Sequence, residues 1–139
     1  MIPPGRPKYE VHRVYDEDQG RGYRVLVDRL WPRGVSKEKA ALDEWAKDAA
    51  PSDGLRRWYG HEPDKFAEFA RRYRAELTTS PAKETVARLR ATAKKKSVVL
   101  LTATGDVDHS GAAVLLTALV GRKSGDVPAR TNRRPPTGS

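Results

Sequence analysis

The order of apolar and polar residues along the chain predicts strands separated by helices. Residues 10–15 and 23–28 are rich in β-forming side chains, and each segment leads into a turn. Residues 97–103 form a continuous apolar run, which is typical of a strand covered on both faces. The two early strands are close enough in the sequence to form a hairpin or to be neighbours in one sheet.

Five segments have helical spacing. Ser36 is placed to cap a helix that runs to about residue 48. The other four helices are expected to begin at Pro51-Ser52, at Pro63, at Ser80-Pro81 and at Ser110. Long helical connections between strands favour an α/β fold. We therefore expect a single layered domain with a small, at least partly parallel sheet flanked by about five helices.

The ends of the chain differ from its middle. Residues 1–8 contain three prolines and predict a flexible N-terminal arm. Residues 122–139 are rich in Gly, Pro, Arg and Thr and almost free of apolar side chains, so we expect a disordered basic tail. The chain has 139 residues, which predicts one folded domain, and this domain is expected to span residues 9–121.

Composition excludes several classes of protein. The chain has no cysteine, which rules out disulfides, cysteine-based zinc sites and cysteine nucleophiles. It has no apolar run of about 18 residues and no signal-peptide core, so we expect a cytoplasmic protein without membrane contact. A net charge of +9 favours an anionic partner. Cofactor and oligomeric state stay open.

One motif is specific enough to indicate a family. The heptapeptide Asp28-Arg29-Leu30-Trp31-Pro32-Arg33-Gly34 resembles the signature of the YeaO-like family, a group of bacterial domains of unknown function. Further matching segments follow in order, and together they span about residues 9–120: Trp45-Ala46-Lys47-Asp48, Ala50-Pro51-Ser52, Leu55-Arg56-Arg57-Trp58-Tyr59-Gly60-His61, Glu68-Phe69, Tyr73-Arg74-Ala75-Glu76-Leu77 and the apolar strand with its Asp-rich loop and His109. The resemblance implies an α/β fold and a small cytoplasmic bacterial protein, and it implies no particular activity.

Two positions depart from the family pattern. Glu62 stands where the family tends to have Asp before the proline, and Ser110-Gly111 replaces an Asn-containing pair.

The loops that follow the strands are the expected binding site, because ligands of open α/β sheets lie outside the carboxyl ends of the strands. If the second and last strands are parallel neighbours, the loops 29–34 and 104–111 meet. Two or more guanidinium groups there favour a carboxylate or a phosphate. The candidate ligand-binding residues are Arg29, Trp31, Arg33, Arg56 and His61, and the candidate catalytic residues are His109, Asp106 and Asp108.

Each of these residues also has a structural interpretation. Asp28 and Arg29 could form an ion pair that pins the turn, and Trp31-Pro32 could pack in the core. His61 could form a hydrogen bond at a helix N-terminus.

The loop 105–111 could cradle a phosphate, let Asp106 or Asp108 orient His109 for acid–base chemistry, or simply cap the following helix. Three ligands within four residues seldom reach one ion, so we expect no metal site.

Two functions therefore compete. The first is a protein that holds an anionic, phosphate- or carboxylate-bearing small molecule at the strand ends, with or without a reaction. The alternative is nonspecific association with nucleic acid through the basic helices at residues 64–96 and the basic tail. A partner-binding module without chemistry is a third possibility.

Overall fold

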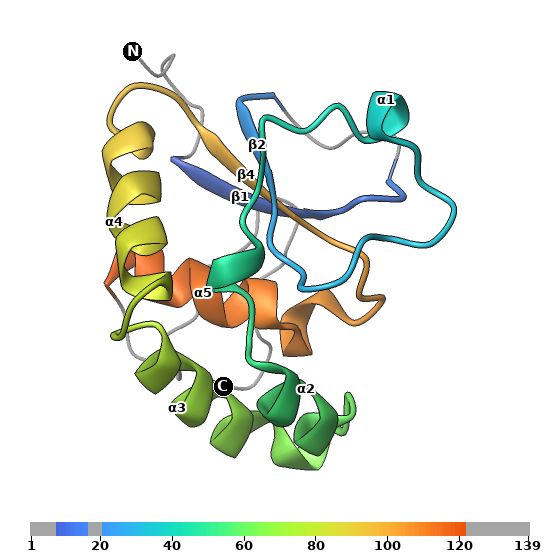
Figure 1. Ribbon diagram of the computed structural model, residues 1–139, viewed down its shortest axis with the longest axis vertical. Helices are drawn as coiled ribbons and strands as arrows, with labels where there is room; N and C mark the ends of the chain where they lie inside the picture. The colour runs from blue at the N-terminus through green and yellow to red at the C-terminus, as the bar shows by residue number, and fades with distance from the viewer. Residues whose placement is uncertain (1–7, 17–20, 122–139) are drawn as a thin grey trace, which may run out of the picture.

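A computed structural model describes residues 8–16 and 21–121. The expected tail at 122–139 and nearly all of the arm at 1–8 lie outside these residues. The described strands are β1 (Tyr9–Arg13), β2 (Tyr23–Leu26), β3 (Glu44–Trp45) and β4 (Val98–Thr102). They form one all-parallel sheet in the order β1-β4-β2-β3 (Figure 1). The α/β fold with a parallel sheet is confirmed.

β4 is one of the two inner strands of this sheet. All of its side chains are buried, as the apolar run predicted. β1 and β2 both pair with β4 and not with each other, so the possible hairpin between them is wrong. The most apolar strand takes the position where both edges are hydrogen-bonded and both faces are removed from water.

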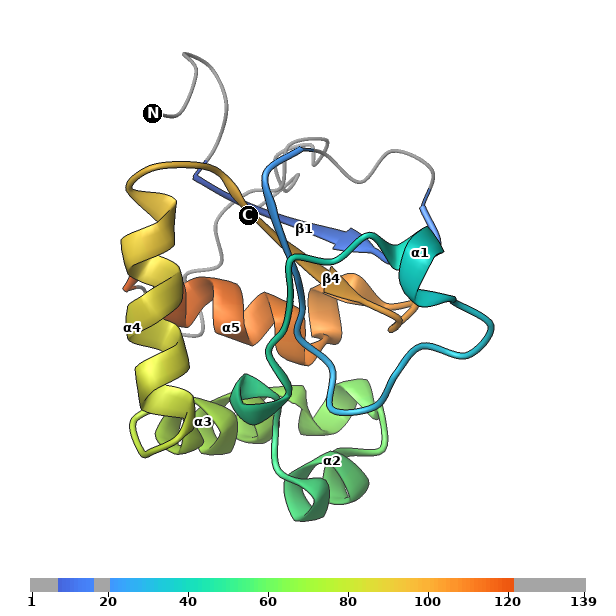
Figure 2. The same cartoon turned by 45° about the horizontal axis from the view of Figure 1, so that its top comes forward.

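Five α-helices occur in the described part of the chain: α1 (Lys37–Ala40), α2 (Asp53–Tyr59), α3 (Phe66–Glu76), α4 (Ala82–Ala93) and α5 (Gly111–Val120). Figures 1 and 2 show α3, α4 and α5 on the same side of the sheet. The core between them and the sheet includes Tyr73, Leu89, Leu100 and Leu115. Short 3-10 turns at Lys47–Ala49, Pro63–Lys65 and Val107–His109 complete the described elements.

The helix expected from Ser36 to about residue 48 is wrong beyond its first turn. Ser36 caps α1 as predicted, with its hydroxyl accepting from the N–H of Lys39, but α1 ends at Ala40. The Arg24 guanidinium binds the carbonyls of Ala40 and Ala41. The residues that follow form β3 beside β2. Backbone pairing with a strand distant in sequence therefore outweighs the local helical pattern.

Candidate anion pocket at the strand ends

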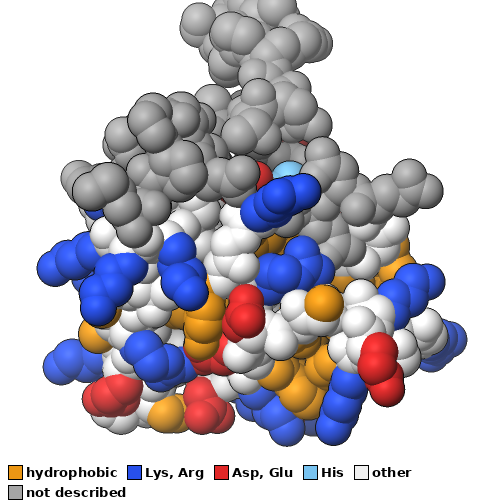
Figure 3. Space-filling model, turned by 90° about the horizontal axis from the view of Figure 1, so that it is seen from above, with side chains coloured by type: hydrophobic (Ala, Val, Ile, Leu, Met, Phe, Trp, Pro, Cys, Tyr) orange, Lys and Arg blue, Asp and Glu red, His pale blue; other side chains and the backbone are white. Residues whose placement is uncertain are grey.

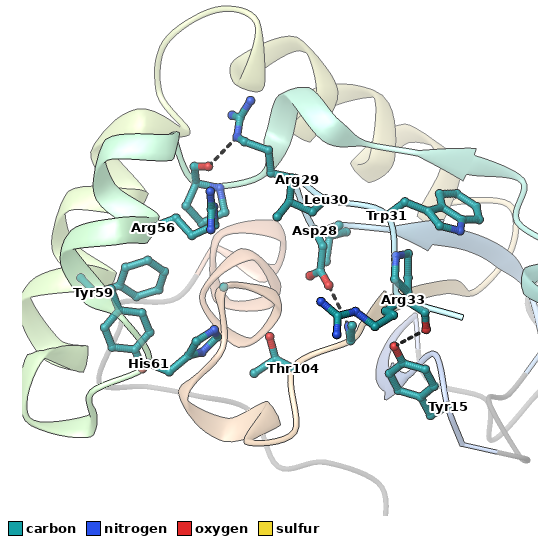
Figure 4. A pocket seen from close by; sticks show the side chains of 16 residues that line it. Tyr15, Asp28, Arg29, Leu30, Trp31, Arg33, Arg56, Tyr59, His61 and Thr104 are labelled. Atoms are coloured by element: carbon teal, nitrogen blue, oxygen red, sulfur yellow. Dashed lines mark hydrogen bonds between the residues drawn. The ribbon is translucent and has the colours of Figure 1, made fainter. Parts of the chain in front are cut away.

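A pocket of about 340 Å³ opens at the carboxyl ends of three parallel strands. Tyr15 follows β1, the segment 27–33 follows β2, and Ala103 and Thr104 follow β4; all of them line the pocket (Figure 4). Residues of α2 and its flanking segments, Phe69 of α3 and the first residue of α5 form the remaining wall. The loops after β2 and β4 therefore meet, because these strands are parallel neighbours.

The structure brings all five candidate ligand-binding residues to this pocket: Arg29, Trp31, Arg33, Arg56 and His61. Their side chains differ in how many hydrogen bonds and ion pairs they form within the protein. The Arg29 guanidinium donates to the carbonyls of Pro51 at 2.9 Å and Ala50 at 3.3 Å. Its Nε also lies 3.8 Å from the carboxylate of Asp53. Arg29 therefore joins the loop after β2 to the segment that precedes α2, and these contacts use two of its five N–H donors.

Arg33 differs from Arg29 in that its side chain is exposed and has no hydrogen bond or ion pair within the described residues. Its backbone carbonyl accepts a hydrogen bond from the hydroxyl of Tyr15 at 3.0 Å. This bond joins the segment after β1 to the loop after β2. Figure 4 shows the Arg33 side chain extending back toward the pocket rather than away from it.

Arg56 supplies the second guanidinium available to a ligand. One terminal nitrogen lies 3.4 Å from the carboxylate of Asp53. Its Nε is buried and has no acceptor among the described residues. A buried N–H without an acceptor costs about 1–3 kcal/mol, so an acceptor that reached this atom would be bound favourably.

His61 follows α2 in a left-handed backbone conformation, with φ of 59°. A non-glycine residue pays about 1–2 kcal/mol for this conformation. Its ring lies 5.9 Å from that of Tyr59, and within the described residues it makes no hydrogen bond. The bond expected at a helix N-terminus is therefore not formed, and the imidazole lines the pocket with free nitrogens.

Trp31 forms part of the wall. Its indole N–H donates to the carbonyl of Val35, and its ring packs edge-on against Trp45 at 5.3 Å. The Trp45 indole in turn donates to the carbonyl of Asp28 at 2.7 Å. These contacts hold the loop after β2 in shape.

Among the described residues, Asp28 is the one carboxylate that lines the pocket. Its two oxygens accept from the Thr102 hydroxyl and the Ala103 N–H, each at 2.7 Å. Burial raises the pKa of Asp28, while these two bonds and the nearby His61 act in the opposite direction. Among the described residues Asp28 takes part in no ion pair, so the possible ion pair with Arg29 is not formed. The Arg29 guanidinium binds the carbonyls of Pro51 and Ala50 instead.

His109, Asp106 and Asp108 do not line the pocket, contrary to the expectation that they share a concavity with Arg33. His109 Nδ1 pairs with Asp106 at 2.8 Å, and its carbonyl accepts from the Tyr59 hydroxyl. Tyr59, which does line the pocket, therefore binds the turn that carries His109. The chain turns away after Thr104 into a 3-10 turn, and this turn presents Ser110 as the cap of α5.

Tyr15, Tyr59 and Thr104 also line the pocket, although they are not among the five candidate ligand-binding residues. Thr104 begins the loop 104–111 that the rule for strand ends singled out, and Tyr15 likewise lies within two residues of the end of a strand. Tyr59 carried no such signal, because an aromatic residue on a helix is usually part of the core.

The basic side chains of α3 and α4 are mostly paired within the chain. Arg71 and Arg72 both bind Glu68 and hold its pKa at about 2. Arg74 donates to Thr117. Arg88 pairs with Glu44, and Arg90 donates to carbonyls at the end of α5. Figure 3 shows Lys and Arg on the upper face in separate groups, with neutral, apolar and acidic side chains between them.

Two absences concern the described residues 8–16 and 21–121 alone. No group of three or more His, Asp or Glu side chains there is arranged to hold a metal ion. No helix in this part of the chain is both long and apolar enough to cross a membrane.

The parallel sheet and its cavity place the chain among α/β proteins, and sequence comparisons narrow this to one family. Residues 8–136 match a family model, DUF488-N3i, that is described as the inactive DUF488-N3 subclade. The chain belongs to the DUF488 family.

Two relatives support this assignment. The chain is 47% identical over 116 residues to Uncharacterized protein Rv3073c of Mycobacterium tuberculosis, covering 83% of this chain and 96% of the relative. It is 43% identical over 107 residues to Uncharacterized protein YeaO of Escherichia coli, covering 76% and 91%. The YeaO-like resemblance is confirmed. Neither name states an activity, and no solved structure matches the chain.

Proposed function

We propose that the protein binds a small anionic molecule, carrying a phosphate or a carboxylate, in the pocket at the carboxyl ends of β2 and β4. The observation that carries this proposal is the buried Nε–H of Arg56, which has no acceptor among the described residues although Arg56 lines the pocket. An anion in the pocket would supply the missing acceptor and remove the cost of leaving this donor unpaired.

Two further features support the same ligand class. The Arg33 guanidinium and the His61 imidazole line the same pocket without a partner among the described residues, and a guanidinium fork matches the oxygens of carboxylates and phosphates. Gly111, the first residue of α5, also lines the pocket, so the positive end of the α5 dipole adds to the attraction.

The proposal is for binding and includes no reaction. The family description, an inactive subclade, favours a binding protein over a catalyst. The acid–base candidates His109, Asp106 and Asp108 have no part in it.

The proposal is tested by isothermal titration calorimetry with inorganic phosphate and with malonate, on the wild type and on Arg33→Ala and Arg56→Ala. Each substitution removes a charge-assisted hydrogen bond, so we expect each to weaken binding by about 1.5–3 kcal/mol.

Arg57→Ala is the matched control, because Arg57 lies next to Arg56 on α2 and is exposed but does not line the pocket. It makes the same change in net charge and should leave the affinity unchanged. The absence of binding by both anions, or equal losses in all three variants, would count against a specific pocket.

Nonspecific association with nucleic acid is the alternative proposal. It has less support, because the arginines of α3 and α4 named above already have partners within the chain. It would have to rest on Lys83, on Lys94, Lys95 and Lys96, and on the basic residues at 122–139.

A further inference from the structure

The pocket contains a carboxylate that the anion-binding proposal does not use. Asp28 lines the same cavity as Arg33, Arg56 and His61, yet no ion pair among the described residues includes it. This negative charge repels an anion, so in a pocket that served an anion alone Asp28 would be explained by its two bonds to Thr102 and Ala103 and not by the ligand.

The internal bonds of Asp28 do not exhaust its capacity. An ionised carboxylate has about four acceptor sites, and the Thr102 hydroxyl and the Ala103 N–H occupy one on each oxygen. Removing a charge from water is costly unless it is paired and hydrogen-bonded. Asp28 therefore remains a strong acceptor whose compensation within the protein is incomplete.

The cations come from two sides of the pocket. Figure 4 shows Arg56 and His61 coming from α2 and the segment after it, while Arg33 comes from the loop after β2 and extends its guanidinium toward Asp28 in this view. A cavity of about 340 Å³ is large enough for a small molecule to touch both kinds of group at once.

We propose that the ligand of this pocket is a small zwitterion, an anion that also carries an ammonium group, and that Asp28 receives the ammonium group while Arg33 and Arg56 receive the anionic group. This inference rests on the proposed anion-binding function and adds a selectivity for amino-bearing anions. An amino acid and an amine phosphate share the required chemistry.

The test compares probes that differ only in the ammonium group. Titration calorimetry of the wild type with phosphoethanolamine and with propyl phosphate isolates this group on a phosphate. Titrations with β-alanine and with butyrate isolate it on a carboxylate. We expect the amino-bearing member of at least one pair to bind roughly tenfold more tightly, the scale of one charge-assisted hydrogen bond.

Asp28→Asn should reduce this preference to about twofold or less, while Arg56→Ala should weaken both members of a pair together. Equal affinities within both pairs in the wild type would overturn the inference but leave the anion pocket standing. A preference that survives in Asp28→Asn would also overturn it. If none of the four probes binds, the proposed function fails as well. The comparison within the wild type decides the question even if Asp28→Asn does not fold.

Discussion

Two arginines of one short motif have different roles. Arg29 donates to the carbonyls of Pro51 and Ala50 and is half-buried, whereas Arg33 is exposed and has no partner among the described residues. Arg29 is therefore expected to contribute to stability and Arg33 to binding.

We predict that Arg29→Ala lowers the free energy of unfolding by about 1.5–3 kcal/mol, because it removes hydrogen bonds from a charged donor and leaves two carbonyls without it. Arg33→Ala should change it by less than about 0.5 kcal/mol, as is usual for a surface substitution. Urea unfolding followed by circular dichroism measures both values. Equal losses for the two variants would contradict the division of roles.

Asp28 gives a prediction for pH dependence. Burial raises its pKa in the folded state above the ordinary value of about 4, so between these two values the folded protein binds more protons than the unfolded chain. The stability that Asp28 contributes therefore falls as the pH rises through this interval. Asp28→Asn lacks this titration.

The measurement is the free energy of unfolding in urea from about pH 4 to about pH 7, for the wild type and Asp28→Asn. The difference, wild type minus variant, should decrease as the pH rises, because all other groups titrate alike in both proteins. A difference that is constant or that increases with pH would show that burial does not dominate at this carboxylate.

Among the helices, α5 shows how a local signal and tertiary packing support each other. The Ser110 hydroxyl accepts from the N–H of Ala113 and donates to the carbonyl of Val107, while Gly121 ends the helix in a left-handed conformation. Most side chains of α5 are buried between the sheet and α3. The cap of α5 therefore also binds the 3-10 turn Val107–His109, because the Ser110 hydroxyl donates to the carbonyl of the first residue of that turn.

We predict that Ser110→Ala lowers the free energy of unfolding by about 1–2 kcal/mol, since it removes a buried helix cap and one of the two hydrogen bonds to the Val107 carbonyl. Ser36→Ala is the control: Ser36 also caps a helix, but α1 has four residues and Ser36 is exposed. Ser36→Ala should lower the free energy of unfolding by about 0.5 kcal/mol or less. Thermal and urea unfolding measure both losses in free energy of unfolding. Equal losses for Ser110→Ala and Ser36→Ala would contradict the prediction.

At the scale of the whole molecule, the net charge of +9 does not by itself identify a partner. Much of the positive charge on α3 and α4 is paired, and the pocket uses only a few of the remaining cations. Long-range attraction to any polyanion remains, and salt screens it.

We therefore predict that binding to duplex DNA is weak, independent of sequence and reduced roughly tenfold or more between about 50 and about 200 mM salt. Fluorescence anisotropy with two unrelated duplexes measures all three properties. Deleting residues 122–139 should weaken the binding further, because this segment is basic. Sequence-selective binding that persists at the higher salt would reveal a recognition element and favour the alternative function.

Much of the fold could be predicted because its signals are local. The continuous apolar run at Val98–Thr102 defined a buried strand, and the cap and C-terminal glycine of Gly111–Val120 defined a helix. The rule for strand ends located the pocket and five of its lining residues. It failed for His109, because the path of the chain after Thr104 depends on a 3-10 turn that the sequence pattern does not announce.

The sequence by itself determined the fold class, the burial of β4 on both faces, and the presence of Arg33, Arg56 and His61 at the carboxyl ends of the strands. Only the tertiary structure decided that residues 44 and 45 form a strand and that Arg29 binds carbonyls. It also decided that Asp28 lines the pocket without an ion pair. The reason is physical: apolar runs and helix caps act between residues near in sequence, whereas these outcomes depend on hydrogen bonds between groups about 20 to 75 residues apart.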